Sequence, residues 1–285
     1  MRSVTRHIGS MGALILGATT SGWAQGTCFP ADSSNEAKTF AIRSVPLAYS
    51  GLGVATRDQP WQVWAALEVS LVPTIDSATR TPTFCRQGKV ENANLLDAFP
   101  RPRVGLTLPA HFAIEASWVP PITVNDVTGN LFGLALSWTY PIGATLRLAV
   151  RGHTTLGEIK GPITCPEEAV TDTLNLECFG GTVSDDRYSP NIFGVDATLG
   201  WAPGSGRWRP YIGGGYNRLQ PRFQVHFVRS DGSLDDTLVA VDLNRAVVYG
   251  GLQWLPNAWL QVGGEVYAAP ADEVTGRIFL KAYLN

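Results

Sequence analysis

Residues 131–142 read Leu-Phe-Gly-Leu-Ala-Leu-Ser-Trp-Thr-Tyr-Pro-Ile, and this stretch decides the fold. Every second residue from Phe132 to Tyr140 is apolar, and the residues between them are glycine, alanine, serine and threonine. A period of two places the large side chains on one face of an extended strand. Because a tilted strand of about 9 to 11 residues crosses a bilayer, the stretch is typical either of a soluble sheet or of a membrane-spanning β-barrel.

The same alternation recurs along most of the chain. Runs of about 9 to 13 residues start near positions 61, 106, 146, 193, 246, 260 and 278, and residues 208–227 are β-like without a clear facing. We expect an all-β fold, an antiparallel transmembrane β-barrel of about ten strands, with about eight as the alternative count. The tenth strand requires residues 39–55, where the alternation is poor and Pro46 interrupts it.

The composition agrees with a membrane barrel. Of the 285 residues, 45% are hydrophobic and 16% are charged, whereas soluble domains carry about 25% charged residues. No apolar run of about 18 residues follows the first 25 positions, which excludes a helical membrane protein. Only four residues are lysine and no basic patch stands out, so nucleic acid is not expected as a partner.

Residues 1–24 have the pattern of a secretory signal peptide. Arg2 and Arg6 form its positive start, residues 8–22 are apolar or small, and Gly22-Trp23-Ala24 predicts cleavage after Ala24. An uncleaved anchor helix is the alternative, but the apolar part is shorter than the roughly 20 residues that a span needs.

Four cysteines in an exported chain predict two disulfides, for which three pairings exist. Cys165 and Cys178 lie in one polar segment and are easily joined, which leaves Cys28 with Cys85. These spacings fit no metal or redox motif, so we expect no metal and no cofactor.

Connection lengths and aromatic residues distinguish a lipid environment from a protein core. Short connections at 141–144, 202–207 and 255–258 alternate with longer polar ones, and aromatic residues flank each short connection. This placement is typical of the aromatic belt at a membrane interface. The predicted aromatic girdle consists of Trp138, Tyr140, Trp201, Trp208, Trp254 and Trp259.

The short connections give the predicted strands a direction, because tight turns of bacterial barrels lie in the periplasm. The rule places the segment with Cys165 and Cys178 outside. If residues 103–118 form one outward strand, Trp61 lies at the outer rim, and residues 73–102 lie in the periplasm with Cys28 and Cys85. The predicted division is a signal peptide at 1–24, a periplasmic segment at 25–38 and the barrel at 39–285, with long loops at 73–102 and 158–190.

The faces opposite the apolar ones carry nearly balanced charge. The predicted lumen-facing polar network consists of Glu68, His111, Glu115, Arg147, Arg151, His153, Asp196, Arg245, Glu265 and Lys281. A barrel of about ten strands is narrow, and charges inside it must be paired because an unpaired charge is costly to desolvate. The favoured interpretation is an ion-paired interior that closes the barrel, and the alternative is a polar pathway for a small solute.

Catalysis is not expected from these residues. His111 and Glu115 are four positions apart in one strand, about 13 Å, too far to share a proton or a metal. His153-Thr154-Thr155 is faintly similar to outer-membrane lipid hydrolases, but no serine accompanies His153 and no Gly-x-Ser-x-Gly motif exists.

Val104-Gly105-Leu106-Thr107-Leu108-Pro109, followed by Trp118-Val119-Pro120-Pro121, looks like a strand-and-loop pattern of small, porin-like bacterial outer-membrane β-barrel proteins. Pro210-Tyr211-Ile212-Gly213-Gly214-Gly215 resembles them too, and the resemblance covers most of residues 61–285. It implies outer-membrane lipid and the assembly machinery as partners. Such barrels commonly end in an aromatic residue, whereas here Tyr283 lies two positions earlier.

The resemblance brings no assigned activity. We therefore expect an exported outer-membrane barrel that is structural or lets small or hydrophobic solutes pass passively, the solute being unidentified. A soluble periplasmic or secreted ligand-binding β-sandwich and an outer-membrane lipid-modifying enzyme are the alternatives.

Overall fold

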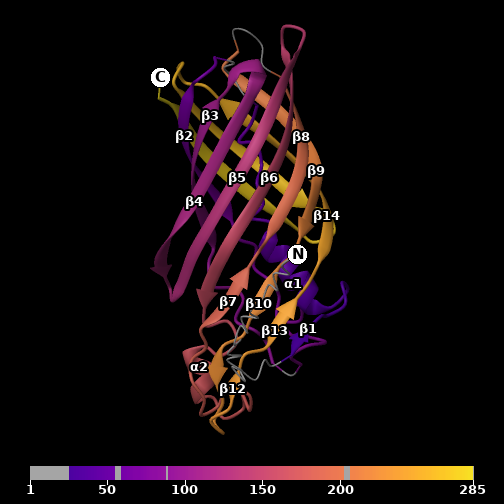
Figure 1. Ribbon diagram of the computed structural model, residues 1–285, viewed down its shortest axis with the longest axis vertical. Coiled ribbons are helices and arrows are strands. Elements are labelled where there is room, and N and C mark those ends of the chain that lie inside the picture. Colours follow the sequence, from indigo (N-terminus) through magenta and orange to yellow (C-terminus); the bar gives the residue numbers. More distant parts are fainter. Residues whose placement is uncertain (1–25, 55–58, 88, 202–205, 285) are drawn as a thin grey trace, which may run out of the picture.

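The computed structural model describes residues 26–54, 59–87, 89–201 and 206–284. Ten strands in these ranges form one closed antiparallel barrel, which confirms the predicted all-β fold (Figure 1). Around the barrel they are β2 (Val63–Leu71), β3 (Ala98–Thr107), β4 (Phe112–Val124), β5 (Val127–Ile142), β6 (Leu146–Gly161), β8 (Ile192–Trp201), β9 (Trp208–Leu219), β14 (Leu243–Trp254), β15 (Leu260–Ala269) and β16 (Glu273–Tyr283). The ring closes where β16 pairs with β2. Among the described residues, no helix is long and apolar enough to cross a membrane.

The two ends of the barrel differ in their connections (Figure 1). We call one the short-turn end, where β3, β5, β8, β14 and β16 finish. The other, the long-loop end, carries the connections 72–97, 162–191 and 220–242. Figure 1 shows the short-turn end at the top, near the C-terminus, and the long loops at the bottom.

Short strands continue the barrel wall at the long-loop end. The end of β6 pairs with β7 (Asp186–Ser189), and the sheet goes on through β10 (Arg222–Gln224), β13 (Leu238–Ala240) and β1 (Thr27–Cys28). A small hairpin, β11 (Phe227–Val228) with β12 (Leu234–Asp235), and helix α2 (Glu167–Thr171) lie beyond it (Figure 1).

The single strand predicted over 103–118 is in fact two strands. β3 and β4 form a hairpin in which Leu106 pairs with Ile114. The short helix η1 (Pro109–His111) makes the turn, with Ala110 at φ 58° and His111 at φ 66°. Paired residues in this hairpin are both even-numbered or both odd-numbered, as Leu106 and Ile114 are. Even-numbered residues therefore face outward both before and after the turn, and the apolar alternation continues through it. The period of two therefore concealed the turn.

Residues 39–55, predicted as a strand, form none where the structure describes them. Helix α1 (Asn35–Ser44) occupies their first part, and residues 45–54 continue as an irregular segment. The Ser34 side chain caps α1 by accepting a hydrogen bond from Ala37 N. Apolar and small residues spaced three or four apart form its buried face: Ala37, Phe40, Ala41 and Ser44. This spacing is helical, so the strand prediction was wrong.

The two errors cancel in the strand count but not in the placement of the loops. Trp61 lies at the short-turn end, where its amide donates to the Thr107 carbonyl at 2.7 Å. Residues 72–97 lie at the opposite end, together with the Cys165–Cys178 segment. Residues 27–28 also lie there, because β1 pairs with β13. Segments predicted on opposite sides of the membrane therefore share one end of the barrel.

Both predicted disulfides are confirmed. Cys28 is bonded to Cys85, and Cys165 is bonded to Cys178. The first bond ties the start of the described chain to the connection 72–97, and the second closes a loop between β6 and β7.

Candidate functional site

Glu68 is completely buried inside the barrel. Arg103 donates a hydrogen bond to its carboxylate, and Ser70 Oγ donates another at 3.0 Å. Nitrogens of Arg101 and Arg277 lie 3.9 Å from the same carboxylate. These groups compensate the desolvation cost of the buried carboxylate. Removing one partner of a buried ion pair typically costs about 3–5 kcal/mol of stability.

Two further glutamates balance the same arginines. Arg103 Nη1 lies 3.6 Å from Glu115, and Arg277 Nη1 lies 3.6 Å from Glu265. Three buried cations thus face three buried carboxylates across neighbouring strands. The interior is close to neutral at this level, as the closed-barrel interpretation requires.

The three arginines also hold the N-terminal segment. We call residues 35–54 the plug, because they occupy the lumen. The arginines donate to carbonyl oxygens just beyond α1: Arg277 to Val45 at 2.8 Å, Arg101 to Leu47 at 2.5 Å and Arg103 to Ser50 at 2.8 Å. Residues 45–50 belong to no helix or strand, so their carbonyl oxygens need partners outside regular secondary structure, and the arginines supply them.

A second buried cluster lies on the facing wall. Arg151 binds Asp196 with two hydrogen bonds of 3.0 and 2.6 Å, and Tyr249 donates to the same carboxylate at 2.6 Å. His153 Nε2 lies 3.5 Å from Asp196, and its ring stacks on Tyr49 of the plug. The bidentate arginine contact fixes the geometry of this cluster.

Small residues of the wall make room for the plug. A Cβ at Gly133 would lie 2.2 Å from the ring of Tyr49, so only glycine fits beside that ring. Farther along, the Gln261 amide donates to Leu52 O at 3.2 Å. The plug and the paired charges therefore occupy most of the described part of the lumen.

Most of the predicted network residues do line this interior. Seven are buried: Glu68, Glu115, Arg151, His153, Asp196, Glu265 and Lys281. Arg147 and Arg245 are half-buried, and Arg245 pairs with Asp272 at 2.7 Å at the long-loop end. His111 is exposed in the turn η1, because that turn breaks the strand on which its facing was predicted.

Sequence reasoning missed the three central arginines. Arg101 lay in the segment 73–102 that was predicted as a loop, and Arg103 was the first residue of the predicted strand 103–118, although Pro100-Arg101-Pro102-Arg103 alternates in step with Val104. Arg277 shares a face with Lys281 and could have been found by the same parity. The plug has no period-two pattern, but the helical spacing of Ala37, Phe40 and Ala41 could have indicated α1.

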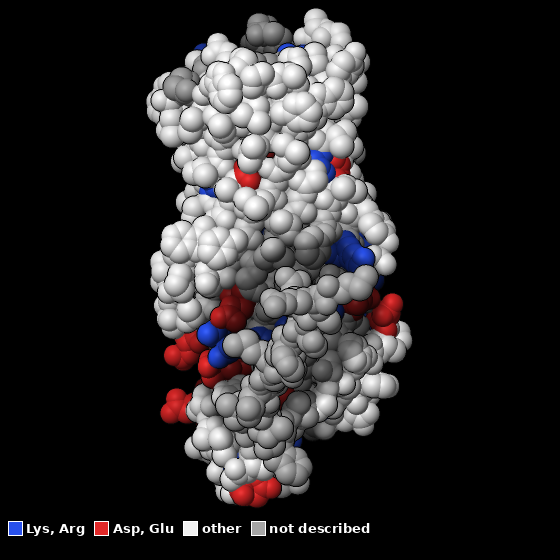
Figure 2. Space-filling view, in the orientation of Figure 1, with Lys and Arg blue, Asp and Glu red and all other residues white. Residues whose placement is uncertain are grey.

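The outer surface of the barrel is apolar. Large side chains at alternate positions point outward, among them Val104, Leu134 and Ile212, each more than half exposed. Figure 2 shows this surface mostly free of charge, whereas charged side chains gather around the long-loop end. The predicted girdle residues are all exposed: Trp138, Tyr140, Trp201, Trp208, Trp254 and Trp259. An apolar band with aromatic residues near its edge is the surface of a protein surrounded by lipid.

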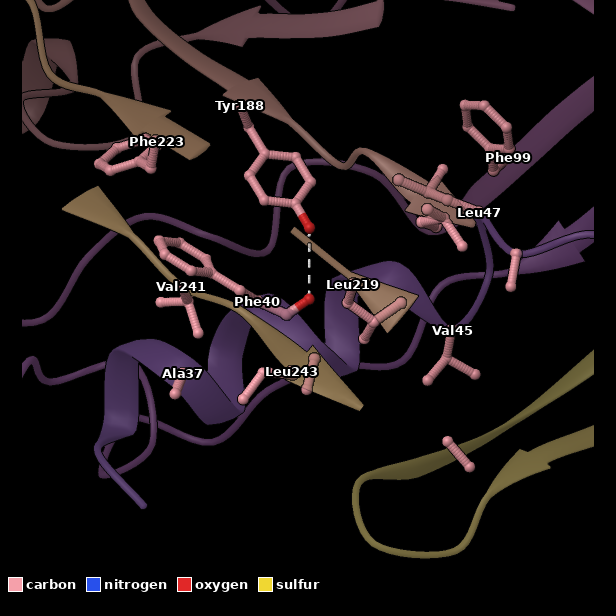
Figure 3. Packing of buried hydrophobic residues seen from close by; sticks show 14 of the residues in the cluster. Ala37, Phe40, Val45, Leu47, Phe99, Tyr188, Leu219, Phe223, Val241 and Leu243 are labelled. Atoms are coloured by element: carbon pink, nitrogen blue, oxygen red, sulfur yellow. Dashed lines mark hydrogen bonds between the residues drawn. The ribbon is translucent and has the colours of Figure 1, made fainter. Parts of the chain in front are cut away.

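An apolar cavity of about 120 Å³ lies at the long-loop end, between the plug and the connection 72–97. Phe40 and Leu47 contribute to its wall from the plug, and Phe99, Tyr188 and Phe223 do so from the strands. Figure 3 shows these side chains converging, with the Tyr188 hydroxyl donating to the Phe40 carbonyl. An apolar cavity of comparable size, about 150 Å³, stays dry and accepts benzene in other proteins.

Glu36 secures the edge of this cavity. Its carboxylate accepts hydrogen bonds from the backbone amides of Thr83, Phe84 and Cys85 at 3.1, 2.8 and 2.7 Å. Burial alone would raise the pKa of Glu36, but these amide hydrogen bonds hold the pKa below its ordinary value. The Glu36 carboxylate therefore joins the plug to the connection that carries Cys85, and the Cys28–Cys85 disulfide ties the chain just before the plug to the same connection.

A smaller, polar cavity of about 50 Å³ lies toward the short-turn end. Its wall includes Glu115, Arg151, Asp196 and Lys281. The Glu68 cluster and residues 45–50 lie between this cavity and the apolar one. The interior thus has an apolar chamber, a charged barrier and a polar chamber in sequence along its length.

No protein-family model matches the chain, and no curated protein matches its sequence. Its fold is similar to outer-membrane β-barrels. The attachment invasion locus protein Ail of Yersinia pestis is 9% identical, with 79% of this chain and 99% of Ail covered and a TM-score of 0.32. The toluene transporter TodX of Pseudomonas putida is 10% identical, with 85% and 71% covered and a TM-score of 0.33. Omp33 of Acinetobacter baumannii is 9% identical, with 80% and 100% covered and a TM-score of 0.29.

These similarities concern the fold alone. The strand pairing and the apolar outer surface identify the chain as an outer-membrane β-barrel independently of them. The soluble β-sandwich is excluded by the closed ring of strands and by apolar side chains that point out of it.

Proposed function

We propose that the protein binds small apolar molecules at the outer face of the outer membrane, as the first step of their passive uptake. It does this without a standing water-filled pore and without a chemical step. The long-loop end faces outward in this proposal, because bacterial barrels have short periplasmic turns and longer extracellular loops. The observation that carries the proposal is the apolar cavity of about 120 Å³ at that end, above a lumen filled by the plug.

The cavity has the chemistry of a binding site for an apolar ligand. Ligand sites are mostly apolar concavities with a few polar groups. Phe40, Leu47 and Phe99 supply the apolar wall, while Glu91 and Arg43 supply polar groups. The plug forms one side, so a movement of the plug is the step that would connect the cavity with the polar chamber.

Binding can be measured with benzene, whose size suits the cavity. Protein in lipid nanodiscs is equilibrated with radiolabelled benzene, and empty nanodiscs measure the share dissolved in lipid. We expect saturable binding of benzene by the wild type. Ala93 lies in the cavity wall, so Ala93→Phe fills the cavity and should abolish this binding. Ala78→Phe, at an exposed position of the same connection, is the matched control and should leave it unchanged. If benzene shows no saturable binding beyond lipid, the proposal is wrong.

Conductance tests the closed lumen. In planar bilayers the wild type should show no steady openings, because paired charges and the plug occupy the lumen. A stable conductance of the wild type would contradict the proposal and favour an open pore.

A further inference from the structure

Lys281 is a buried cation whose charge has no counterpart among the described residues. It lies on the inward face of β16, with 7% of its surface exposed. Its ammonium makes neither an ion pair nor a hydrogen bond with the part of the chain that the structure describes. It lies 3.9 Å from the centre of the Trp64 ring and 5.5 Å from that of Tyr283. A ring face attracts a cation, but it is a poor acceptor for the three N–H donors of an ammonium.

The ammonium borders the polar cavity of about 50 Å³. Its Nζ atom is accessible from this cavity, in contrast to fully enclosed atoms such as Glu115 Oε2. The wall of the cavity continues to exposed His111 in the turn η1, so a solute can reach it from the short-turn end. Each water-sized group needs about 10–15 Å³ of such space, so the cavity holds about three or four of them.

The carboxylates of the same wall are already neutralised. Arg103 Nη1 lies 3.6 Å from Glu115, and Arg151 donates two hydrogen bonds to Asp196. The same balance extends through the described interior of the barrel, where four buried carboxylates accompany four buried arginines: Glu68, Glu115, Asp196 and Glu265 with Arg101, Arg103, Arg151 and Arg277. Lys281 is a fifth buried cation beyond this balance.

A small anion is the solute that this arrangement suits. A buried charge without a counter-ion is costly, and an anion beside Lys281 would remove that cost. The hydroxyl groups of Ser137 and Thr139 line the same cavity and are further donors for an anion. A cation would meet the charge of Lys281, and a neutral solute would leave that charge uncompensated.

We propose that the polar cavity binds a small monovalent anion, such as formate or a halide, which accepts a hydrogen bond from Lys281 Nζ. The site is separate from the apolar cavity, because the Glu68 cluster and residues 45–50 lie between the two. It is therefore independent of the proposed binding of apolar molecules.

Trp64 reports on this site, because its ring contacts Lys281 and only 3% of its surface is exposed. Iodide quenches tryptophan fluorescence on contact. Protein in lipid nanodiscs is titrated with iodide at constant ionic strength, which is maintained with gluconate, an anion too large for the cavity. The difference between the wild type and Trp64→Phe isolates the Trp64 signal. We expect iodide to quench this signal with a saturating dependence, and formate to restore it by competition.

Lys281→Met removes the charge and keeps an unbranched side chain. The affinity for iodide should fall about tenfold or more, as expected for loss of a hydrogen bond from a charged donor. Acrylamide, a neutral quencher, should reach Trp64 no better than in the wild type, and this shows that the variant keeps its fold. Lys160→Met is the matched control, because Lys160 pairs with Glu158 and does not line the cavity. The control should keep the wild-type affinity.

The opposite results are equally distinct. Quenching of Trp64 that rises linearly with iodide, or that formate does not reverse, would mean that the cavity holds water alone and would overturn the inference. An unchanged affinity in Lys281→Met would refute the role of Lys281. An equal loss in Lys160→Met would mean a general electrostatic effect. Saturable quenching by caesium, a cationic quencher, would refute the choice of an anion.

Discussion

Arg277 Nη2 donates a hydrogen bond of 2.8 Å to the carbonyl oxygen of Val45, across 232 positions of sequence. The contact joins the last strand of the barrel to the residue that follows helix α1. Since Arg277 also neighbours Glu68 and Glu265, one side chain links the ion pairs of the wall to the backbone of the plug. Stability of the barrel and closure of its lumen are therefore coupled.

Glu68→Gln should destabilise the barrel strongly. The substitution leaves Arg101, Arg103 and Arg277 without their shared carboxylate, and breaking a buried ion pair costs about 3–5 kcal/mol. Urea unfolding of protein reconstituted in vesicles measures the loss. Glu158→Gln removes a half-exposed partner of Lys160 and should cost less than about 1 kcal/mol. Equal effects of the two substitutions would contradict a central role for Glu68.

Removal of the Cys28–Cys85 disulfide should loosen the plug. The bond closes 57 residues, for which chain entropy gives about 4 kcal/mol of stabilisation. In Cys28→Ser/Cys85→Ser we expect a lower unfolding midpoint and transient openings in planar bilayers. Cys165→Ser/Cys178→Ser, whose bond spans 13 residues, should lose about 3 kcal/mol and remain closed. Openings in the second variant would argue against a specific latch on the plug.

The first residues that the structure describes should be accessible from outside the cell. Residues 26 and 27 are exposed at the long-loop end, beside β13. An epitope inserted between Gly26 and Thr27 should bind antibody on intact cells. An epitope between Leu255 and Pro256, at the short-turn end, should bind only after permeabilisation. The reverse pattern would show that the barrel is inserted the other way round.

Acid should weaken the attachment of the plug through Glu36. Its folded-state pKa lies below the ordinary value of 4.5, so the stabilisation is fully present above about pH 4.5 and is lost as the pH falls through the lowered pKa. Glu36→Gln should lose about 1–3 kcal/mol at neutral pH, as expected for hydrogen bonds to a charged group, and should flatten this pH dependence. Asp32→Asn, at an exposed position, should not. The measurement is urea unfolding between about pH 7 and pH 3.

The outward face of most barrel strands could be predicted from sequence, although β9 gave no clear facing. Alternation such as Phe132, Leu134 and Leu136 depends on lipid contact at every second position, and lipid contact is a local property of each strand. Disulfide pairing was also accessible, because few pairings exist for four cysteines. The turn at Pro109 was not, since its two strands continue the same parity.

The sequence by itself determined that the chain is a β-barrel with an apolar outside and a charged inside. Successive side chains of a strand point to opposite faces, so alternate residues show the polarity of each face. Only the tertiary structure decided what fills the inside. The plug is held by contacts such as Arg103 with Ser50 O and Tyr49 beside Gly133, each between residues far apart in sequence. Such contacts leave no periodic trace, because they depend on which strands close the ring around residues 35–54. The position of the apolar cavity follows from that closure.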